Sequence, residues 1–176
     1  MVLKKMNIHN VVVSASLVNL LDLDDIENRY PGLCYRQPGF PSLNLKDTVS
    51  SLCQIFKNGK VIVIGGKSEL EAKELFDSYL ERVPKLGYDT KYSAYKIHNI
   101  VAYYNYGKPV SLVHLAQKPM VSYEPERFPA AVRYRLLDLK ITANIFYSGK
   151  VVILGAKSLD DINAAVEKIK TLLEDG

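Results

Sequence analysis

The residues that first suggest chemistry are those of a phosphate-binding loop. Residues 55–68 read IFKNGKVIVIGGKS and end in Gly66-Lys67-Ser68. The phosphate loop of nucleotide hydrolases ends in the same residue types, but it also needs a glycine five residues before the one that precedes lysine, so that backbone N–H groups surround the phosphates. That position is Val61. The missing glycine disfavours nucleotide hydrolysis, and the segment needs another explanation.

The same segment occurs twice in the chain. Residues 145–158 read IFYSGKVVILGAKS, and IHNVV at 8–12 returns as IHNIV at 97–101, an offset of 99 − 10 = 89 positions. YRQPGF at 35–40 and YEPERF at 123–128 form a further pair. Similarity at a nearly fixed spacing indicates a duplicated structural unit. We predict three parts: a short N-terminal tail at 1–5, a first repeat at 6–92 and a second repeat at 93–176.

Each repeat is predicted to contain a strand, a short helix, three antiparallel strands and a closing helix, which makes the fold class α+β. Glycine after Asn58 and after Ser148 is typical of tight hairpin turns. Ser68 and Ser158 are each followed three residues later by an acidic residue, which is typical of a helix start. The predicted elements of the first repeat are strands at 7–17, 43–45, 51–56 and 60–64 and helices at 23–28 and 69–86; those of the second include a strand at 95–104 and helices at 111–116 and 159–173.

The closing helices are expected to cover one face of the sheet, and the other face is also apolar. Side chains alternate between the two faces along a strand. If Val61 points to the helix, Ile62 and Ile64 point away from it, and Val152 and Leu154 do the same in the second repeat. An exposed apolar face of this size needs a partner. A dimer interface, a covering loop and a closed barrel would each supply one.

Composition narrows the class of protein. The chain has 176 residues, of which 48% are hydrophobic and 24% charged, as in ordinary globular proteins. Its formal net charge of +4 permits a polyanionic partner without requiring one. Cys34 and Cys53 have no counterparts in the second repeat, so we expect free thiols and no zinc site. No apolar run is long enough for a membrane span, and no residue constellation indicates catalysis, a metal or a cofactor. We expect an intracellular protein that is not an enzyme.

Taken together, these segments resemble the core of the TATA-box-binding protein family. The resemblance rests on the paired I-H-N strands, on SYEPERFP at 122–129 and on the twin I-F-x-x-G-K-V segments, and it covers about residues 6–173. It implies a saddle of two pseudo-symmetric repeats, with a ten-stranded antiparallel sheet and four helices on the convex face. It also implies that the concave face binds and bends A·T-rich double-stranded DNA through the minor groove. DNA would then cover the second apolar face.

The resemblance assigns DNA-binding roles to residues that recur in both repeats. The implied wedges between base steps are two pairs of phenylalanines: Phe40, Phe56, Phe128 and Phe146. The implied groove contacts are two asparagines, two valines of the first strands and the apolar residues of later strands: Asn10, Val12, Asn99, Val101, Ile62, Ile64, Val152 and Leu154. The implied phosphate contacts are basic residues at the rim: Lys46, Lys60, Lys67, Arg135, Lys150 and Lys157.

Four positions depart from the family pattern. Family members usually carry threonine directly before the glycine of the G-x-K segment, whereas Ile64 and Leu154 stand there in this chain. Two residues before the second phenylalanine of each repeat, where leucine is usual, the chain has Gln54 and Asn144. We expect these amides to share the concave face and to donate hydrogen bonds to bases. Bending is therefore predicted more directly than a preference for the TATA sequence.

The resemblance also implies protein partners. Tyr123, Glu124 and Glu126, followed by Arg127 in place of a usual apolar residue, match the segment by which the family engages transcription factor IIB. The implied protein is a general initiation factor that acts as a monomer on DNA with a factor IIB-like protein and the RNA polymerase machinery. It would work in the nucleus, in an archaeal cytoplasm or nucleoid, or in a host's transcription compartment. The rival prediction is an interaction module of the same fold, whose apolar concave face holds a protein segment or a small ligand.

Overall fold

The computed structural model describes residues 6–45, 51–82 and 87–174. They form two compact units. The N-unit is Asn10–His98, and the C-unit combines the chain up to His9 with the chain from Asn99 onwards. Lys46 lies outside the described residues, as does the predicted tail at 1–5.

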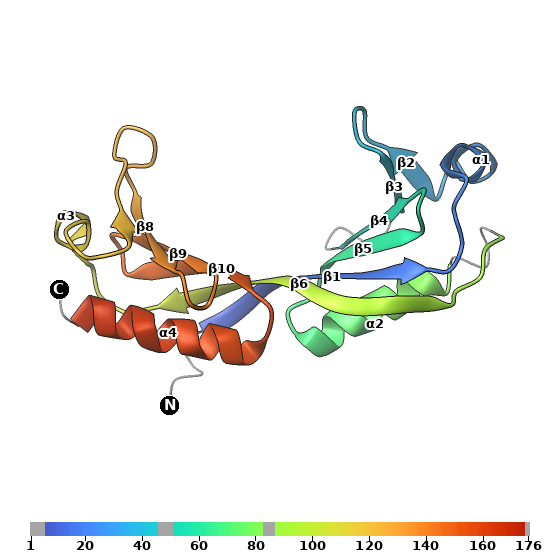
Figure 1. The fold of residues 1–176 in the computed structure, drawn as a ribbon. Coiled ribbons are helices and arrows are strands. Elements are labelled where there is room, and N and C mark those ends of the chain that lie inside the picture. Colours follow the sequence, from blue (N-terminus) through green and yellow to red (C-terminus); the bar gives the residue numbers. More distant parts are fainter. Residues whose placement is uncertain (1–5, 46–50, 83–86, 175–176) are drawn as a thin grey trace. The chain divides into compact units, whose positions relative to one another are not determined.

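The helices and strands occur as two sets with the same order (Figure 1). The first set is β1 (Met6–Leu17), α1 (Leu23–Arg29), β2 (Cys34–Arg36), β3 (Ser42–Leu45), β4 (Leu52–Phe56), β5 (Lys60–Gly65) and α2 (Glu69–Leu80). The second set is β6 (Tyr92–Asn105), α3 (Leu112–Leu115), β7 (Val121–Ser122), β8 (Ala131–Leu136), β9 (Ile141–Phe146), β10 (Lys150–Ala156) and α4 (Leu159–Glu174). The boundaries between the two units fall inside β1 and β6, so each of these strands contributes to both units.

The strands form one ten-stranded antiparallel sheet with the order β2-β3-β4-β5-β1-β6-β10-β9-β8-β7. Four helices accompany it in the described part of the chain. The strand and helix counts and the duplicated order confirm the predicted α+β fold with two repeats.

In each unit the closing helix covers one face of the sheet: α2 lies against β5, and α4 lies against β10. Phe76 of α2 and Ile169 of α4 are fully buried, as are Val63 and Ile153 on the strands beneath them. Burying an aliphatic or aromatic side chain of this size stabilises a fold by about 1.5–3 kcal/mol. This apolar layer holds each helix on its sheet.

Both closing helices begin with the predicted caps. Ser68 Oγ accepts a hydrogen bond from the N–H of Glu71 at 3.0 Å, and the Glu71 carboxylate accepts one from the N–H of Lys67 at 2.8 Å. The start of α4 repeats this pattern with Ser158, Asp161 and Lys157, at 3.1 and 2.8 Å. The first N–H groups of a helix have no partner within the helix, and the two serines satisfy those of Glu71 and Asp161. The two carboxylates bind the N–H groups of Lys67 and Lys157, which directly precede the serines.

The helix α2 ends at Leu80, earlier than the sequence predicts. Glu81 is its C-cap and donates its N–H to the carbonyl of Asp77. Four residues after Leu80 the sequence has Pro84, which carries no N–H to donate to the Leu80 carbonyl. The spacing of apolar residues predicts a longer helix because that spacing takes no account of the missing N–H of Pro84.

Glycines form the two predicted hairpin turns. Gly59 and Gly149 both have φ of +81°, a conformation that suits glycine and strains other residues. A Cβ on Gly149 would lie 2.1 Å from the carbonyl oxygen of Lys108, and one on Gly59 would lie 2.5 Å from that of Asn19. Glycine is therefore required at both turns by conformation and by space.

Candidate nucleic-acid interface

The N-unit sheet has a half-exposed apolar face on the side away from α2. Val12 of β1 lies opposite Ile64 of β5, and Gln54 of β4 lies opposite Ile62. Directly opposed residues in an antiparallel pair share a face. All four are partly exposed, whereas the alternate residue Val63 is buried. Ile62 and Ile64 therefore point away from the helix, as the alternation predicts.

The C-unit has a matching face. Val152 of β10 lies between Asn144 of β9 and Tyr103 of β6, and Leu154 lies opposite Thr142. These side chains are partly or fully exposed to solvent. We call these two surfaces the open faces. By strand alternation they also include Asn10 in the N-unit and Asn99 and Val101 in the C-unit.

A phenylalanine pair borders each open face. In the C-unit, the rings of Phe128 and Phe146 meet edge to face, with centroids 5.9 Å apart and an interplanar angle of 75°. Phe128 keeps 46% of its surface exposed. In the N-unit, Phe40 is 52% exposed, and within the described chain neither Phe40 nor Phe56 has a ring contact. Both pairs are accessible, and only the C-unit pair is stacked.

Asn99 is held in one orientation. Its side-chain oxygen accepts a hydrogen bond from the backbone N–H of Gly155 at 2.8 Å. Its amide NH2 group has no partner among the described residues and is the end free to donate. Asn10, the equivalent residue of the N-unit, makes no such bond in the described part of the chain.

Most of the predicted phosphate-binding residues lie at or near the open faces. Lys60 lies opposite Ser16, Lys150 opposite Asn105, and Arg135 opposite Thr142. The side chains of Lys67 and Lys157 are exposed next to the helix caps. Across residues 6–45, 51–82 and 87–174, none of these five cations has a carboxylate partner. Their charges are therefore available to an anion.

Comparisons with known proteins identify the family. The family model described as transcription factor TFIID, or TATA-binding protein, matches residues 5–86 and 94–175. The chain belongs to this family. The TATA-box-binding protein of Tetrahymena thermophila is 35% identical over 170 residues, which are 94% of this chain and 68% of that protein. The TATA-box-binding protein of Methanothermobacter thermautotrophicus is 36% identical over 170 residues, 94% of this chain and 93% of that protein. The solved structure of Methanococcus jannaschii TBP has a TM-score of 0.85 and 33% identity and covers 98% of this chain and 99% of that one.

The amides Gln54 and Asn144, predicted to take part in the groove contacts of this TATA-binding protein family member, have different surroundings. Gln54 Nε2 donates a hydrogen bond to Asn44 Oδ1 at 3.2 Å, and Asn44 is only 1% exposed. One donor of Gln54 is therefore used inside the N-unit. Asn144 lies opposite Arg133, an exposed residue, and both its amide donors are free within the described chain.

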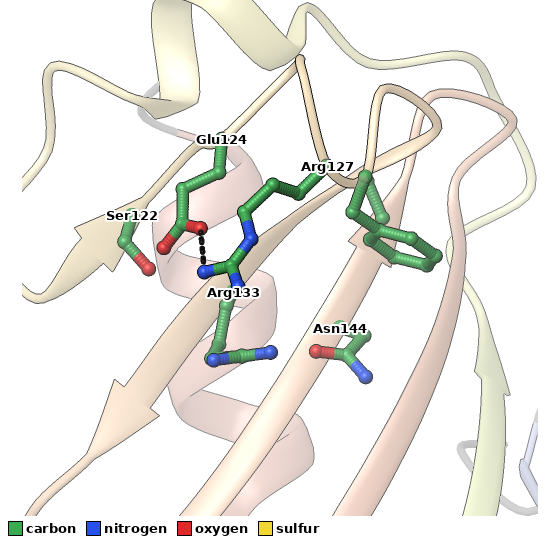
Figure 2. A pocket seen from close by; sticks show the side chains of 7 residues that line it. Ser122, Glu124, Arg127, Arg133 and Asn144 are labelled. Carbon is green, nitrogen blue, oxygen red and sulfur yellow. Dashed lines mark hydrogen bonds and ion pairs between the residues drawn. The ribbon is translucent and has the colours of Figure 1, made fainter.

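An open pocket of about 510 Å³ lies beside this position in the C-unit (Figure 2). Its lining residues are Ser122, Glu124, Arg127, Phe128, Ala131, Arg133 and Asn144. Glu124 and Arg127 form an ion pair at 3.4 Å. The pocket thus brings together two residues predicted for partner binding, one predicted wedge and one predicted groove residue of a TATA-binding protein family member. It also contains Arg133, which the sequence analysis does not assign to the site.

The segment that carries the predicted partner-binding residues is a tight turn. The N–H groups of Arg127 and Phe128 both donate to the carbonyl of Glu124, at 3.1 and 2.8 Å. The Tyr123 hydroxyl donates to the carbonyl of Pro129 at 3.0 Å. Glu126 is exposed at the outside of this turn. The turn therefore presents acidic side chains on a fixed backbone.

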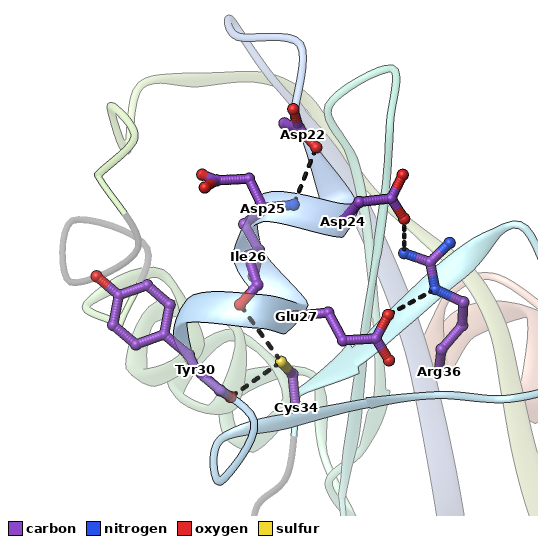
Figure 3. A network of polar contacts seen from close by, with 8 residues as sticks. All are labelled: Asp22, Asp24, Asp25, Ile26, Glu27, Tyr30, Cys34 and Arg36. Atoms are coloured by element: carbon purple, nitrogen blue, oxygen red, sulfur yellow. Dashed lines mark hydrogen bonds and ion pairs between the residues drawn. The ribbon is translucent and has the colours of Figure 1, made fainter.

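At the N-unit edge, α1 is tied to β2 by side-chain contacts (Figure 3). Arg36 donates to Asp24 at 2.6 Å and to Glu27 at 3.0 Å. Cys34 donates its S–H to the carbonyl of Tyr30 at 3.2 Å. These contacts hold the edge strand against the helix.

Cys34 and Cys53 are buried thiols that form no disulfide in the described part of the chain, and burial raises the pKa of the Cys53 thiol far above its usual range. Within the described residues, no three His, Cys, Asp or Glu side chains converge as a metal site would require. In the same part of the chain, no helix combines the length and apolar character needed to cross a membrane.

Proposed function

We propose that this chain is a transcription initiation factor that binds and bends A·T-rich promoter DNA through the minor groove. The observation that carries this proposal is the pair of half-exposed apolar faces, each bordered by two accessible phenylalanines and by basic residues. Its family membership and the names of its relatives, which are TATA-box-binding proteins, agree with this function.

The chemistry of the open faces suits the minor groove. At A·T pairs the floor of this groove offers only the acceptors N3 of adenine and O2 of thymine. The oriented NH2 group of Asn99 is a donor of the required kind. The apolar side chains around it, Val101, Val152 and Leu154, suit contact with sugars and base edges, where shape and deformability decide affinity. We assign the equivalent role in the N-unit to Asn10, with Val12, Ile62 and Ile64.

The phenylalanine pairs suit the role of wedges. Minor-groove proteins that insert apolar side chains between base steps, TATA-binding proteins among them, kink the duplex by roughly 20–90°. Phe128 and Phe146 form one wedge, and Phe40 and Phe56 form the other. In each pair the first ring, Phe40 or Phe128, is exposed. The second ring, Phe56 or Phe146, belongs to the last residue of β4 or β9.

The cations around the open faces suit contacts to DNA phosphates. Phosphate contacts fix the position of a protein on the duplex and supply affinity that falls with salt. Lys60 and Lys150 share the open faces, and the unpaired ammonium groups of Lys67 and Lys157 lie beside the helix caps. Arg135 has the same role on β8. Lys46 keeps the role that the family resemblance implies for it.

Factor recruitment is the second part of the proposed function. The fixed turn at 123–128 presents Glu124 and Glu126, and it matches the family segment that engages transcription factor IIB. We propose that a factor IIB-type protein, and through it the RNA polymerase machinery, binds this turn while the chain sits on DNA as a monomer. No catalytic step or cofactor is part of this function. The protein would act inside the cell, where promoters are transcribed.

An alternative function keeps the fold without the DNA. Ile64 and Leu154, where family members usually have threonine, make the open faces more apolar and would favour a protein segment or a small apolar ligand. The unpaired cations and the oriented Asn99 amide favour DNA over this alternative.

Selection of binding sites from random duplexes tests the proposal. We expect enrichment of A·T-rich sites, followed by binding with micromolar or tighter affinity that weakens as salt is raised. Recovery of no duplex above background would overturn DNA binding and favour the alternative. Enrichment of sites without A·T bias would support DNA binding but refute the proposed readout of A·T pairs in the minor groove.

A further inference from the structure

The two units differ at one position beside the open face. Gln54 and Asn144 each lie two residues before the second phenylalanine of their repeat. Across the neighbouring strand, Gln54 faces Asn44 and Asn144 faces Arg133. Asn44 is buried and hydrogen-bonded to Gln54, whereas Arg133 is exposed. The C-unit therefore carries a cation where the N-unit carries a buried neutral amide.

Arg133 is an uncompensated charge. It lines the pocket shown in Figure 2, whose single lining carboxylate belongs to Glu124. Glu124 is paired with Arg127 at 3.4 Å. Arg133 has no ion pair within the described parts of the chain. Of the two guanidinium groups in the pocket, one is balanced and one is free, so the pocket has a net positive charge.

The other polar groups in the pocket are suited to an oxyanion. The Ser122 hydroxyl and the Asn144 amide line the same space and have no partners in the described chain. A guanidinium group offers several N–H donors in a planar fork that matches two oxygens of a phosphate. Phe128, one of the two stacked rings, lines the pocket as well. An anion bound here would lie next to the C-unit wedge.

We propose that Arg133 binds a phosphodiester group of the DNA backbone beside the base step opened by Phe128 and Phe146. This inference rests on the proposed DNA-binding function and extends it. In the described part of the N-unit, the position equivalent to Arg133 makes no such contact, because Asn44 is neutral and buried. The C-unit therefore contacts one more backbone phosphate than the N-unit. This difference favours one of the two orientations of the protein on an asymmetric promoter.

Methylphosphonate scanning tests this assignment. Single phosphates of a selected asymmetric duplex are neutralised in turn, and dissociation constants are measured for the unmodified chain, Arg133→Gln and Arg133→Lys. For the unmodified chain we expect one phosphate whose neutralisation weakens DNA binding much more than neutralisation of the equivalent phosphate in the other half-site. The difference between the two effects should be about tenfold in the dissociation constant. That extra effect should vanish in Arg133→Gln and persist in Arg133→Lys.

Salt titration provides a second measurement with a matched control. Loss of one phosphate contact should reduce the slope of log K against log[salt] by about 0.9 in Arg133→Gln. The control Lys168→Gln removes an equal charge from α4, where Lys168 pairs with Asp138 at 3.0 Å, and should leave the slope closer to that of the unmodified chain.

The outcomes separate this inference from the proposed function. Binding of DNA by the unmodified chain without a directional phosphate effect would refute the role of Arg133 and leave the proposed function intact. A change in Arg133→Gln that affects only the affinity for a factor IIB-type protein would also refute the phosphate contact and leave the proposed function intact. The pocket would then be a site for an acidic peptide. Failure of the unmodified chain to bind any duplex would overturn both.

Discussion

Phe128 and Phe146 stack edge to face, whereas Phe40 and Phe56, their equivalents in the N-unit, lack a ring contact within the described chain. An edge-to-face pair is stabilised by about 0.5–1.5 kcal/mol beyond its burial. The mutual contact restrains both rings of the C-unit pair, whereas the rings of Phe40 and Phe56 do not restrain each other in this way. If these residues insert between base steps as proposed, the C-unit pair is the better preorganised of the two.

Replacement of both Phe128 and Phe146 by alanine should remove one of the two proposed kinks and reduce the DNA bend by about half. Energy transfer between dyes at the two ends of a duplex measures the bend. Tyr147→Ala, which removes an exposed ring next to Phe146, is the control and should leave the bend unchanged. An undiminished bend in the double variant would show that these rings are not wedges.

Asn99→Asp separates DNA binding from folding. The aspartate retains an oxygen for the N–H of Gly155, so the midpoint of thermal unfolding should change little. It replaces the NH2 donor by an anion that faces groove acceptors, so DNA affinity should fall at least about tenfold. Fluorescence anisotropy with a labelled A·T-rich duplex measures this loss. Wild-type affinity in a folded variant would remove Asn99 from the interface.

Ile64→Thr and Leu154→Thr test the departure from the family pattern. Each threonine would return a hydroxyl donor to an open face that is now apolar. We expect the double variant to select a narrower range of A·T-rich sites than the unmodified chain in the same random-duplex selection. Valine at both positions matches threonine in shape and serves as the control. Identical site preferences for the threonine and valine variants would contradict a role for these hydroxyl groups.

Gly149→Ala should destabilise the fold. Its Cβ would lie 2.1 Å from the carbonyl oxygen of Lys108, and the positive φ adds strain. We expect the free energy of unfolding in urea to fall by more than about 1 kcal/mol. Gly32→Ala, at a position with no atom within 4 Å, should have a much smaller effect. Equal stabilities of the two variants would mean that the hairpin adjusts without cost.

The sequence predicts those structural features that are determined by residues close to one another along the chain. The hairpin glycines and the Ser68 and Ser158 caps are local signals, and each appears in the structure where the sequence places it. The apolar alternation in β5 correctly separates the helix side from the open face, because side-chain direction in a strand depends only on position along it.

Arg133 shows why other features escape such reasoning. Counting four residues from the first phenylalanine of each repeat aligns Asn44 with Val132, which is buried. The strand register instead places Arg133 opposite Asn144, as Asn44 is opposite Gln54. One additional residue between Phe128 and β8 moves the arginine to the exposed side. A shift of one residue inverts every side chain of a strand, so cross-strand partners follow from loop geometry that the repeat alignment does not specify.

The cap at the start of α2 explains why residues 55–68 resemble a nucleotide-binding loop. The backbone N–H of Lys67, directly before the capping Ser68, donates to the carboxylate of Glu71, and that of Lys157 donates to Asp161 in the same way. Helix N-termini attract anions because their N–H groups are unpaired and the helix dipole is positive there. In this chain the anion is covalently part of the helix. A glycine-lysine-serine segment can therefore be the start of a helix whose own carboxylate binds the N–H beside the cap, and a search that reads only these three residues would take it for a nucleotide-binding loop.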